Sequence, residues 1–122
     1  MQYEYFYGAQ AEQFSFYRIP KALFTEPNFR ELSTDAKVLY GILLDRMSLS
    51  LKNQWLDAQN KVYIIFTVEE IMDALNCANQ KATRLMVELE KQAGLIERKR
   101  QGLGRPNFAA TINSKSCEKG DS

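Results

Sequence analysis

The chain has 122 residues, 45% of them hydrophobic, and its 16 basic and 15 acidic side chains leave a formal charge of +1. This length and apolar content suffice for one compact core and are too small for two ordinary domains. The sequence has no His, no secretory signal pattern, no apolar run near the roughly 20 residues of a membrane span, and two Cys without metal-site or disulfide spacing. We therefore expect one soluble cytoplasmic domain with free thiols and with no cofactor, metal or membrane contact.

The first twenty residues are rich in aromatic side chains on both sides of Gly8-Ala9-Gln10-Ala11. Two aromatic strands joined at that turn predict a hairpin, which must dock on this chain's own core or on a second copy, because isolated hairpins are marginal in water. Aromatic residues are enriched at interface centres. We therefore expect residues 1–20 to form an arm that builds a homodimer through Tyr3, Tyr5, Tyr7, Phe14 and Phe16.

A long helix is predicted to open at Leu32-Ser33-Thr34-Asp35, where Ser33 can cap it and Asp35 lies near the positive end of its dipole. Its apolar residues cover more than one stripe, so we expect it at the centre of the core. Residues 57–61 then suggest a small extra hairpin, and Trp55 is expected to anchor on the core. The β-branched run at residues 62–66 predicts a strand.

Residues 66–111 predict two helices followed by a hairpin. Thr67 and Glu70 have capping-box spacing at the start of the first helix, and Val68, Ile71, Met72 and Leu75 form one apolar stripe beneath an acidic outer face. After a short break, Asn79 can cap a second helix over residues 80–93, ended by Gly94. Its inward stripe is Ala82, Leu85, Met86, Leu89 and Ala93.

The outward face of the second helix carries amide, hydroxyl and cationic side chains at Gln80, Lys81, Thr83 and Arg84. Those types read bases in the major groove of duplex DNA: Arg or Lys contacts guanine, Gln contacts adenine, and the Thr methyl contacts thymine. We interpret this as a recognition helix in which these four residues read bases. The alternative is that Lys81 and Arg84 are ordinary solvated surface charges.

The segment after Gly94 predicts a basic β-hairpin with a glycine-rich tip, a wing. Alternation buries Ile96, and the clustered cations would repel one another unless they are solvated or face phosphates. We expect backbone contacts to DNA from Asn79, Arg98, Lys99, Arg100, Arg105 and Asn107. The alternative is a merely solvated hairpin.

The charge distribution favours the DNA interpretation. Residues 1–78 carry seven basic and ten acidic side chains, a net −3, whereas residues 79–107 carry seven and three, a net +4. The rest of the chain has two of each. A basic face on a near-neutral body is typical of a modular DNA-binding protein.

The order helix, strand, helix, helix, strand, strand predicts an α+β winged helix-turn-helix, mainly α with a small antiparallel sheet, over residues 21–112. The polar residues 113–122 are expected to begin a linker. We find no candidate set of acid, base and nucleophile and expect no enzyme. The remaining alternatives are a winged-helix protein-interaction adaptor or a transcriptional repressor.

Four stretches resemble the N-terminal domain of the replication initiator A family of Gram-positive plasmids: FYRIPKALF (16–24), LSTDAKVLY (32–40), VYIIFT (62–67) and GLIERKRQGLGRPN (94–107). The resemblance implies a winged helix that binds repeated double-stranded sites at a plasmid origin, normally as a dimer, to initiate and control plasmid replication. It also implies a separate C-terminal domain, absent from this chain, through which host replication proteins would be recruited.

Overall fold

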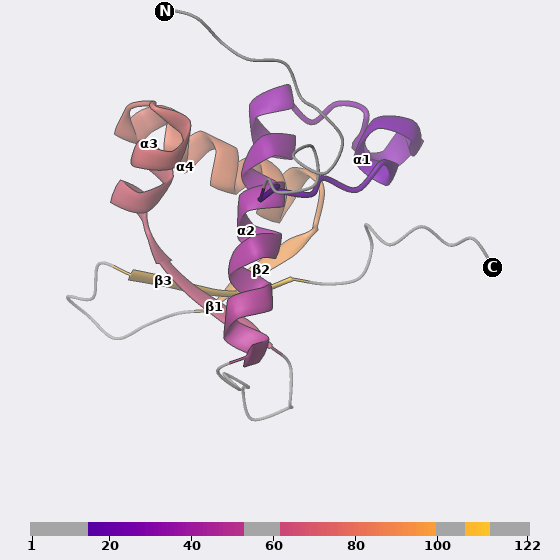
Figure 1. Ribbon diagram of the computed structural model, residues 1–122. Coiled ribbons are helices and arrows are strands. Elements are labelled where there is room, and N and C mark those ends of the chain that lie inside the picture. Colours follow the sequence, from indigo (N-terminus) through magenta and orange to yellow (C-terminus); the bar gives the residue numbers. More distant parts are fainter. Residues whose placement is uncertain (1–14, 53–61, 100–106, 113–122) are drawn as a thin grey trace, which may run out of the picture.

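The computed structural model of the protein describes residues 15–52, 62–99 and 107–112 (Figure 1). A short helix and a 3₁₀ turn precede the long helix, a strand follows it, and two further helices lead into two more strands. The elements are α1 (Ala22–Thr25), η2 (Pro27–Phe29), α2 (Thr34–Lys52), β1 (Tyr63–Thr67), α3 (Val68–Leu75), α4 (Asn79–Val87), the π-helical turn η3 (Glu88–Gln92), β2 (Ile96–Lys99) and β3 (Asn107–Ile112).

The three strands form one antiparallel sheet in the order β1-β3-β2. Tyr63 lies opposite Thr111 in the β1–β3 pair, and Ile96 lies opposite Ile112 in the β2–β3 pair. The β-branched run forms the predicted strand, β1, and pairs with the returning strand of the wing. Because a helix-turn-helix precedes this two-stranded wing, the architecture is the predicted α+β winged helix-turn-helix.

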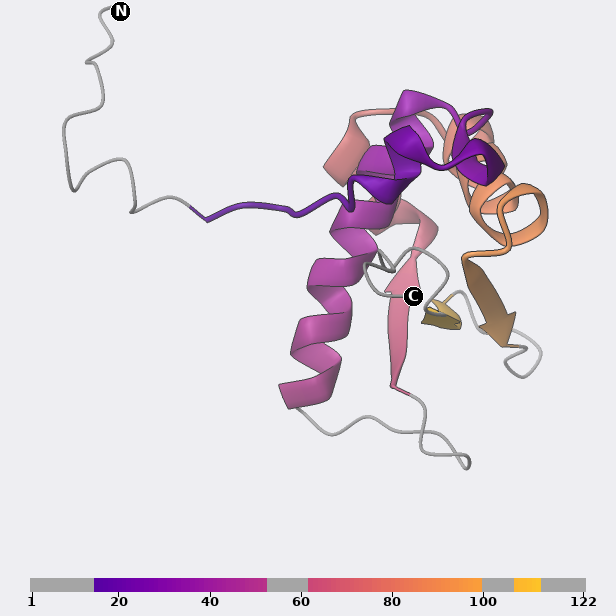
Figure 2. The ribbon, with the colours of Figure 1, turned by 90° about the vertical axis from the view of Figure 1, so that its right-hand side faces the viewer.

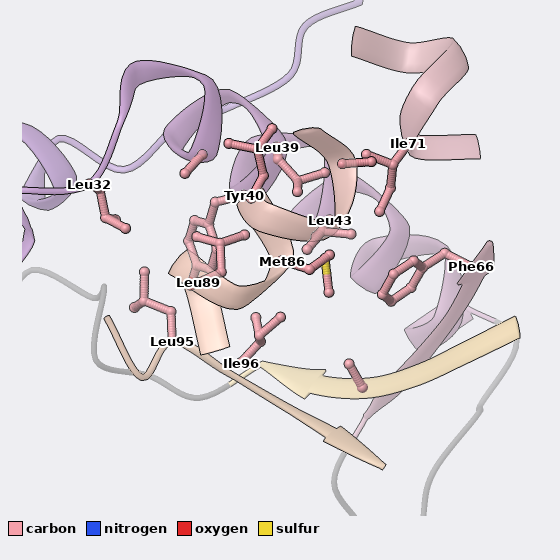
Figure 3. Close-up of a cluster of buried hydrophobic side chains, with 14 of the residues drawn as sticks. Leu32, Leu39, Tyr40, Leu43, Phe66, Ile71, Met86, Leu89, Leu95 and Ile96 are labelled. Carbon is pink, nitrogen blue, oxygen red and sulfur yellow. The ribbon is translucent and has the colours of Figure 1, made fainter. Parts of the chain in front are cut away.

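The helix α2 lies at the centre of the molecule, with β1 along one side and the sheet near its C-terminal half (Figures 1 and 2). Leu39, Tyr40 and Leu43 are almost fully buried on it. Side chains from the helices and strands around α2 meet these three residues in a single buried cluster (Figure 3). These partners are Phe66 of β1, Ile71 of α3, Met86 of α4, Leu89 of η3, and Leu95 and Ile96 at the start of the wing.

Local sequence signals fix three of the helix ends. Thr67 Oγ1 accepts a hydrogen bond from the Glu70 N–H at 3.0 Å while Glu70 Oε1 accepts from the Thr67 N–H at 2.8 Å, the predicted capping box. Ser33 Oγ accepts from the Ala36 N–H at 3.1 Å, the predicted cap of α2. Gly94, with a φ of 67°, ends the helical segment formed by α4 and η3 (79–92), which contains the predicted recognition helix and is called the recognition segment below, and the Leu95 N–H bonds back to the Leu89 carbonyl.

The start of α4 corrects one prediction. Asn79 is the first helical residue, and the capping position belongs to Ala78, which has extended backbone angles and no side-chain cap. The Ala78 carbonyl accepts the first helical hydrogen bond, from the Ala82 N–H at 3.0 Å. The helix therefore begins one residue earlier than expected, because the backbone of Ala78 already has the angles of a capping residue and Asn79 already has those of a helix.

The segment before α1 packs on α2 without forming a strand. A Cβ at Gly41 would lie 2.9 Å from Ile19 Cγ1 and 3.1 Å from the Arg18 carbonyl oxygen, so glycine permits this close crossing. Residues 15–20 have no regular secondary structure, which is a correction to the expected second strand of the aromatic hairpin as far as the described residues reach. Residues 1–14, Trp55, the expected hairpin at 57–61 and the tail lie outside the described residues.

Within the described part of the chain, no helix is both long and apolar enough to span a bilayer. The same residues contain no group of three His, Cys, Asp or Glu side chains arranged to hold a metal ion.

Candidate nucleic-acid interface

The helix α4 presents a continuous, mainly polar stripe to solvent. Gln80, Thr83, Arg84 and Val87 are all exposed, and their spacing of three, one and three places them on one helical face. The opposite face is fully buried at Ala82, Leu85, Met86 and, one turn later, Leu89. The buried stripe at Ala82, Leu85, Met86 and Leu89 and the exposed stripe at Gln80, Thr83 and Arg84 are the predicted ones, and the apolar side chain of Val87, 38% exposed, extends the outward stripe by one turn. Glu88, which was also expected to face outward, is instead half-buried.

Lys81 lies at the edge of this stripe and is engaged by an acid from another element. Its ammonium is 2.6 Å from Asp35 Oδ2 in the first turn of α2. The two side chains are 41% and 50% exposed, so the pair is at the surface and remains accessible to solvent. The positive charge of Lys81 is thus partly neutralised by Asp35.

The far end of the recognition segment is tied to its two neighbours. Glu88 accepts hydrogen bonds from the backbone N–H and the hydroxyl of Ser33, at 2.9 and 3.0 Å, just before α2. Two residues later, Glu90 accepts a hydrogen bond from Arg98 Nε of β2 at 2.7 Å. Because both glutamates lie in the π-helical turn η3, that turn links the end of α4 to α2 on one flank and to the wing on the other.

An ion pair also braces the other end of the helix-turn-helix. Arg46 of α2 donates to the Ile65 carbonyl of β1 at 2.8 Å and to Glu70 Oε2 of α3 at 2.5 Å. Partial burial works to raise the pKa of the Glu70 carboxyl, but hydrogen bonds from Arg46 and Thr67 and the Arg46 charge outweigh it, so the pKa lies below its ordinary value. The start of α3 is therefore fixed to α2 and β1.

The predicted contact residues fall into three groups. Asn79, Gln80, Thr83 and Arg84 are exposed on α4, and Lys81 is at its edge with Asp35. Arg98 lies on β2 against Glu90, with its side chain only 24% exposed. The backbones of Lys99 and Asn107 belong to β2 and β3.

The remaining predicted contacts lie elsewhere. The side chains of Lys99 and Asn107, and the whole of Arg100, Arg105, Tyr3, Tyr5, Tyr7 and Phe14, lie outside the described residues. Phe16, the one predicted dimer contact in the described chain, is 67% exposed.

Sequence reasoning missed the acidic partners of this surface. The sequence pattern predicts for Asp35 only a favourable interaction with the α2 dipole, and for Glu88 only a place on the solvent side of the helix predicted over residues 80–93. Glu90 was given no role. A signal existed for Glu90 and Arg98, since they flank Gly94 on consecutive elements, whereas Asp35 is so distant from Lys81 in sequence that no local pattern connects them.

The similarity of this chain to known proteins agrees with this geometry. Residues 15–118 match the family model for the N-terminus of replication initiator protein A. A solved structure described as the N-terminal domain of a DNA binding protein has a TM-score of 0.72 and 38% identity, covering 92% of this chain and 85% of that one. The structure of a Rep-DNA complex also has a TM-score of 0.72 and 38% identity, covering 90% of this chain and 84% of that one.

Two further relatives extend the match. The structure of an MDR initiator has a TM-score of 0.69 and 39% identity, covering 90% of this chain and 86% of that one. A 41 kDa protein of Lactobacillus helveticus is 32% identical over 92 residues, which are 75% of this chain and 26% of that protein. The chain thus spans about a quarter of that relative's length. Since the family model covers most of the sequence, this chain belongs to the family of replication initiator protein A N-terminal domains.

Proposed function

We propose that this domain binds double-stranded DNA at a plasmid replication origin and thereby initiates and controls plasmid replication. The observation that carries the proposal is the outward stripe of α4, in which an amide, a hydroxyl and a guanidinium follow one another on one face of a helix whose continuation η3 is hydrogen-bonded to β2 of the wing. A related structure is described as a Rep-DNA complex, which supports the same activity for this chain. We assign the domain no catalytic step.

The proposed contacts divide into base readout and backbone contacts. Gln80, Lys81, Thr83 and Arg84 are proposed to contact base edges in the major groove, because their side chains start from the exposed face or edge of α4. Asn79 at the start of the helix and the wing residues Lys99, Arg100, Arg105 and Asn107 are proposed to contact the sugar-phosphate backbone. For Arg98 the hydrogen bond to Glu90 adds a second role, which is to hold the wing against the recognition segment.

Assembly is a further part of the proposal. We propose that the chain is a homodimer that reads two half-sites, with the aromatic residues of positions 1–20 at the interface. If so, removal of residues 1–12 should convert a dimer into a monomer in analytical ultracentrifugation. An unchanged mass after the deletion would exclude the arm as the dimer contact.

Recruitment of host replication proteins belongs to the complete initiator. Because this chain spans 26% of the length of its curated relative, we propose that the host proteins bind mainly to the other parts of the full-length protein. The DNA-binding step can therefore be tested with this chain alone.

The test is duplex binding across a salt series, with the plasmid origin, a random duplex and single-stranded DNA of equal length as probes. A DNA reader should prefer duplex, and the logarithm of its affinity should fall linearly with the logarithm of salt concentration, with a slope of about −0.9 for each phosphate contact. A protein-interaction adaptor should show neither behaviour. Binding to promoter DNA in place of the origin would instead favour a repressor.

A further inference from the structure

We propose that Asp35 is a specificity-determining positioning residue, which orders the Lys81 ammonium for contact with a base and reduces its attraction to phosphate. This inference rests on the proposed DNA-binding function. It starts from the ion pair between Lys81 Nζ and Asp35 Oδ2, 2.6 Å apart, which joins the first turn of α4 to the first turn of α2.

The geometry leaves the ammonium available for a further contact. A lysine ammonium can donate three hydrogen bonds, and the Lys81 side chain remains 41% exposed while its ammonium is paired with the single oxygen Asp35 Oδ2. The neighbouring position on the same flank of α4, Arg84, is exposed and forms no ion pair with any residue that the structure describes. Lys81 can therefore contact DNA beside Arg84 without leaving Asp35.

The ion pair should strengthen binding to a matching base and weaken binding to phosphates alone. A free lysine side chain loses much rotamer freedom when it is fixed, and a side chain already held by a carboxylate loses less. Binding to a matching base therefore benefits from Asp35. Binding to phosphates alone depends on net charge, and the Asp35 carboxylate lowers the charge next to Lys81. Both effects raise specificity, since affinity for a matching duplex rises while affinity for other duplexes, bound through their phosphates alone, falls.

The structure also supplies a matched control on the same helix. Asp45 of α2 is exposed, lies about 15 Å further along the helix axis at 1.5 Å per residue, and forms no ion pair with a residue of the described chain. Asp35→Asn and Asp45→Asn therefore remove the same charge from α2, and only the first change affects Lys81.

The experiment measures dissociation constants by fluorescence anisotropy for a random 30-bp duplex and for a duplex selected by the wild-type chain from a randomised library. Asp35→Asn should bind the random duplex about two- to five-fold more tightly, the effect of one surface ion pair, with a salt slope steeper by up to about 0.9. It should bind the selected duplex no more tightly than the wild type. Asp35→Glu, which keeps a carboxylate, should retain most of the wild-type specificity ratio, the dissociation constant for the random duplex divided by that for the selected duplex.

The Lys81→Met background and the Asp45→Asn control decide the outcome. In a Lys81→Met background Asp35→Asn should change the ratio no more than Asp45→Asn does. An equal effect of Asp35→Asn and Asp45→Asn in the wild-type background, or an effect that persists without Lys81, would overturn the role of Asp35 alone. A wild-type chain that binds no duplex would overturn the proposed function and this inference together. Thermal melting of each variant checks that only folded protein is compared.

Discussion

The carboxylate of Glu88, in the turn that ends the recognition segment, accepts hydrogen bonds from both the backbone N–H and the hydroxyl of Ser33, 55 positions away in the sequence. The same Ser33 hydroxyl accepts the hydrogen bond that caps α2. One glutamate therefore fixes the start of the central helix and the end of the recognition segment to each other. This link helps to set the orientation of the outward stripe of α4 relative to α2.

We expect Glu88→Ala to lower the free energy of unfolding by about 1–3 kcal/mol, because the part-buried Ser33 N–H would lose its partner. Glu88→Gln should be intermediate, since its amide oxygen can still accept one of the two hydrogen bonds. Lys91→Ala, on the exposed side of the same turn, should change stability by no more than about 0.5 kcal/mol. Urea unfolding measures all three, and an equal loss for Glu88→Ala and Lys91→Ala would contradict the expected role of the link.

Arg84 and the wing arginines are expected to contribute differently to DNA binding. Arg84→Ala should cost about 1–3 kcal/mol on a selected duplex and relax the preference at one base pair. Arg100→Ala or Arg105→Ala should weaken binding to selected and random duplexes alike. The salt slope should become shallower by about 0.9, the value for one phosphate contact. Anisotropy titrations on both duplexes separate the two classes. An equal loss on selected and random DNA for Arg84→Ala would refute base readout by this residue.

Much of the fold is predictable from the sequence because its signals are local. The capping box of Thr67 and Glu70 lies within one helical turn, the apolar stripe of α4 has a simple helical period, and Gly94 is placed where only a left-handed residue ends the segment smoothly. Each of these depends on residues close together in the chain. Short-range physics is enough to predict the order of the elements from α2 to β3 and the buried stripe of α4.

The surface charge was less predictable because it depends on tertiary contacts. The net charge of +4 over residues 79–107 treats Lys81 as a free cation, whereas the fold brings Asp35 onto it from a distant helix. Arg98 likewise looked like a wing cation and is bound by Glu90 across the turn at Gly94. Pairings of this kind are set by how the elements pack, which no periodicity in a single sequence specifies.

Thymine methyl groups are expected to be read by the apolar parts of the outward stripe. Thr83 and Val87 lie one turn apart on the exposed face of α4, and either methyl can contact the thymine 5-methyl group. Replacing a contacted thymine by uracil should weaken wild-type binding about fourfold, the effect of burying one methyl group at ~0.8 kcal/mol. Val87→Ala should abolish this sensitivity at one thymine, and Thr83→Ser at another. Sensitivity that survives both substitutions would assign the methyl contacts elsewhere.

The Arg46–Glu70 pair should give the protein a small pH-dependent stability. The pKa of Glu70 in the folded state lies below its ordinary value of 4.5, because the hydrogen bonds from Arg46 and Thr67 outweigh the effect of burial. A lowered folded-state pKa means that the stabilisation is fully present above about pH 5 and is lost as the pH falls through the folded-state value. Since the Glu70 side chain is 46% exposed, the contribution should stay below about 1 kcal/mol.

Comparison of wild type with Glu70→Gln by urea unfolding at pH 7 and pH 3 measures this contribution. The wild type should be the more stable protein at pH 7, and the difference should shrink at pH 3, where the carboxyl is increasingly protonated and its attraction to Arg46 is lost. Glu69→Gln is the matched control, because Glu69 is exposed in the same first turn and forms no ion pair within the described chain. If the difference between wild type and Glu70→Gln is as large at pH 3 as at pH 7, the charge of Glu70 does not brace α3.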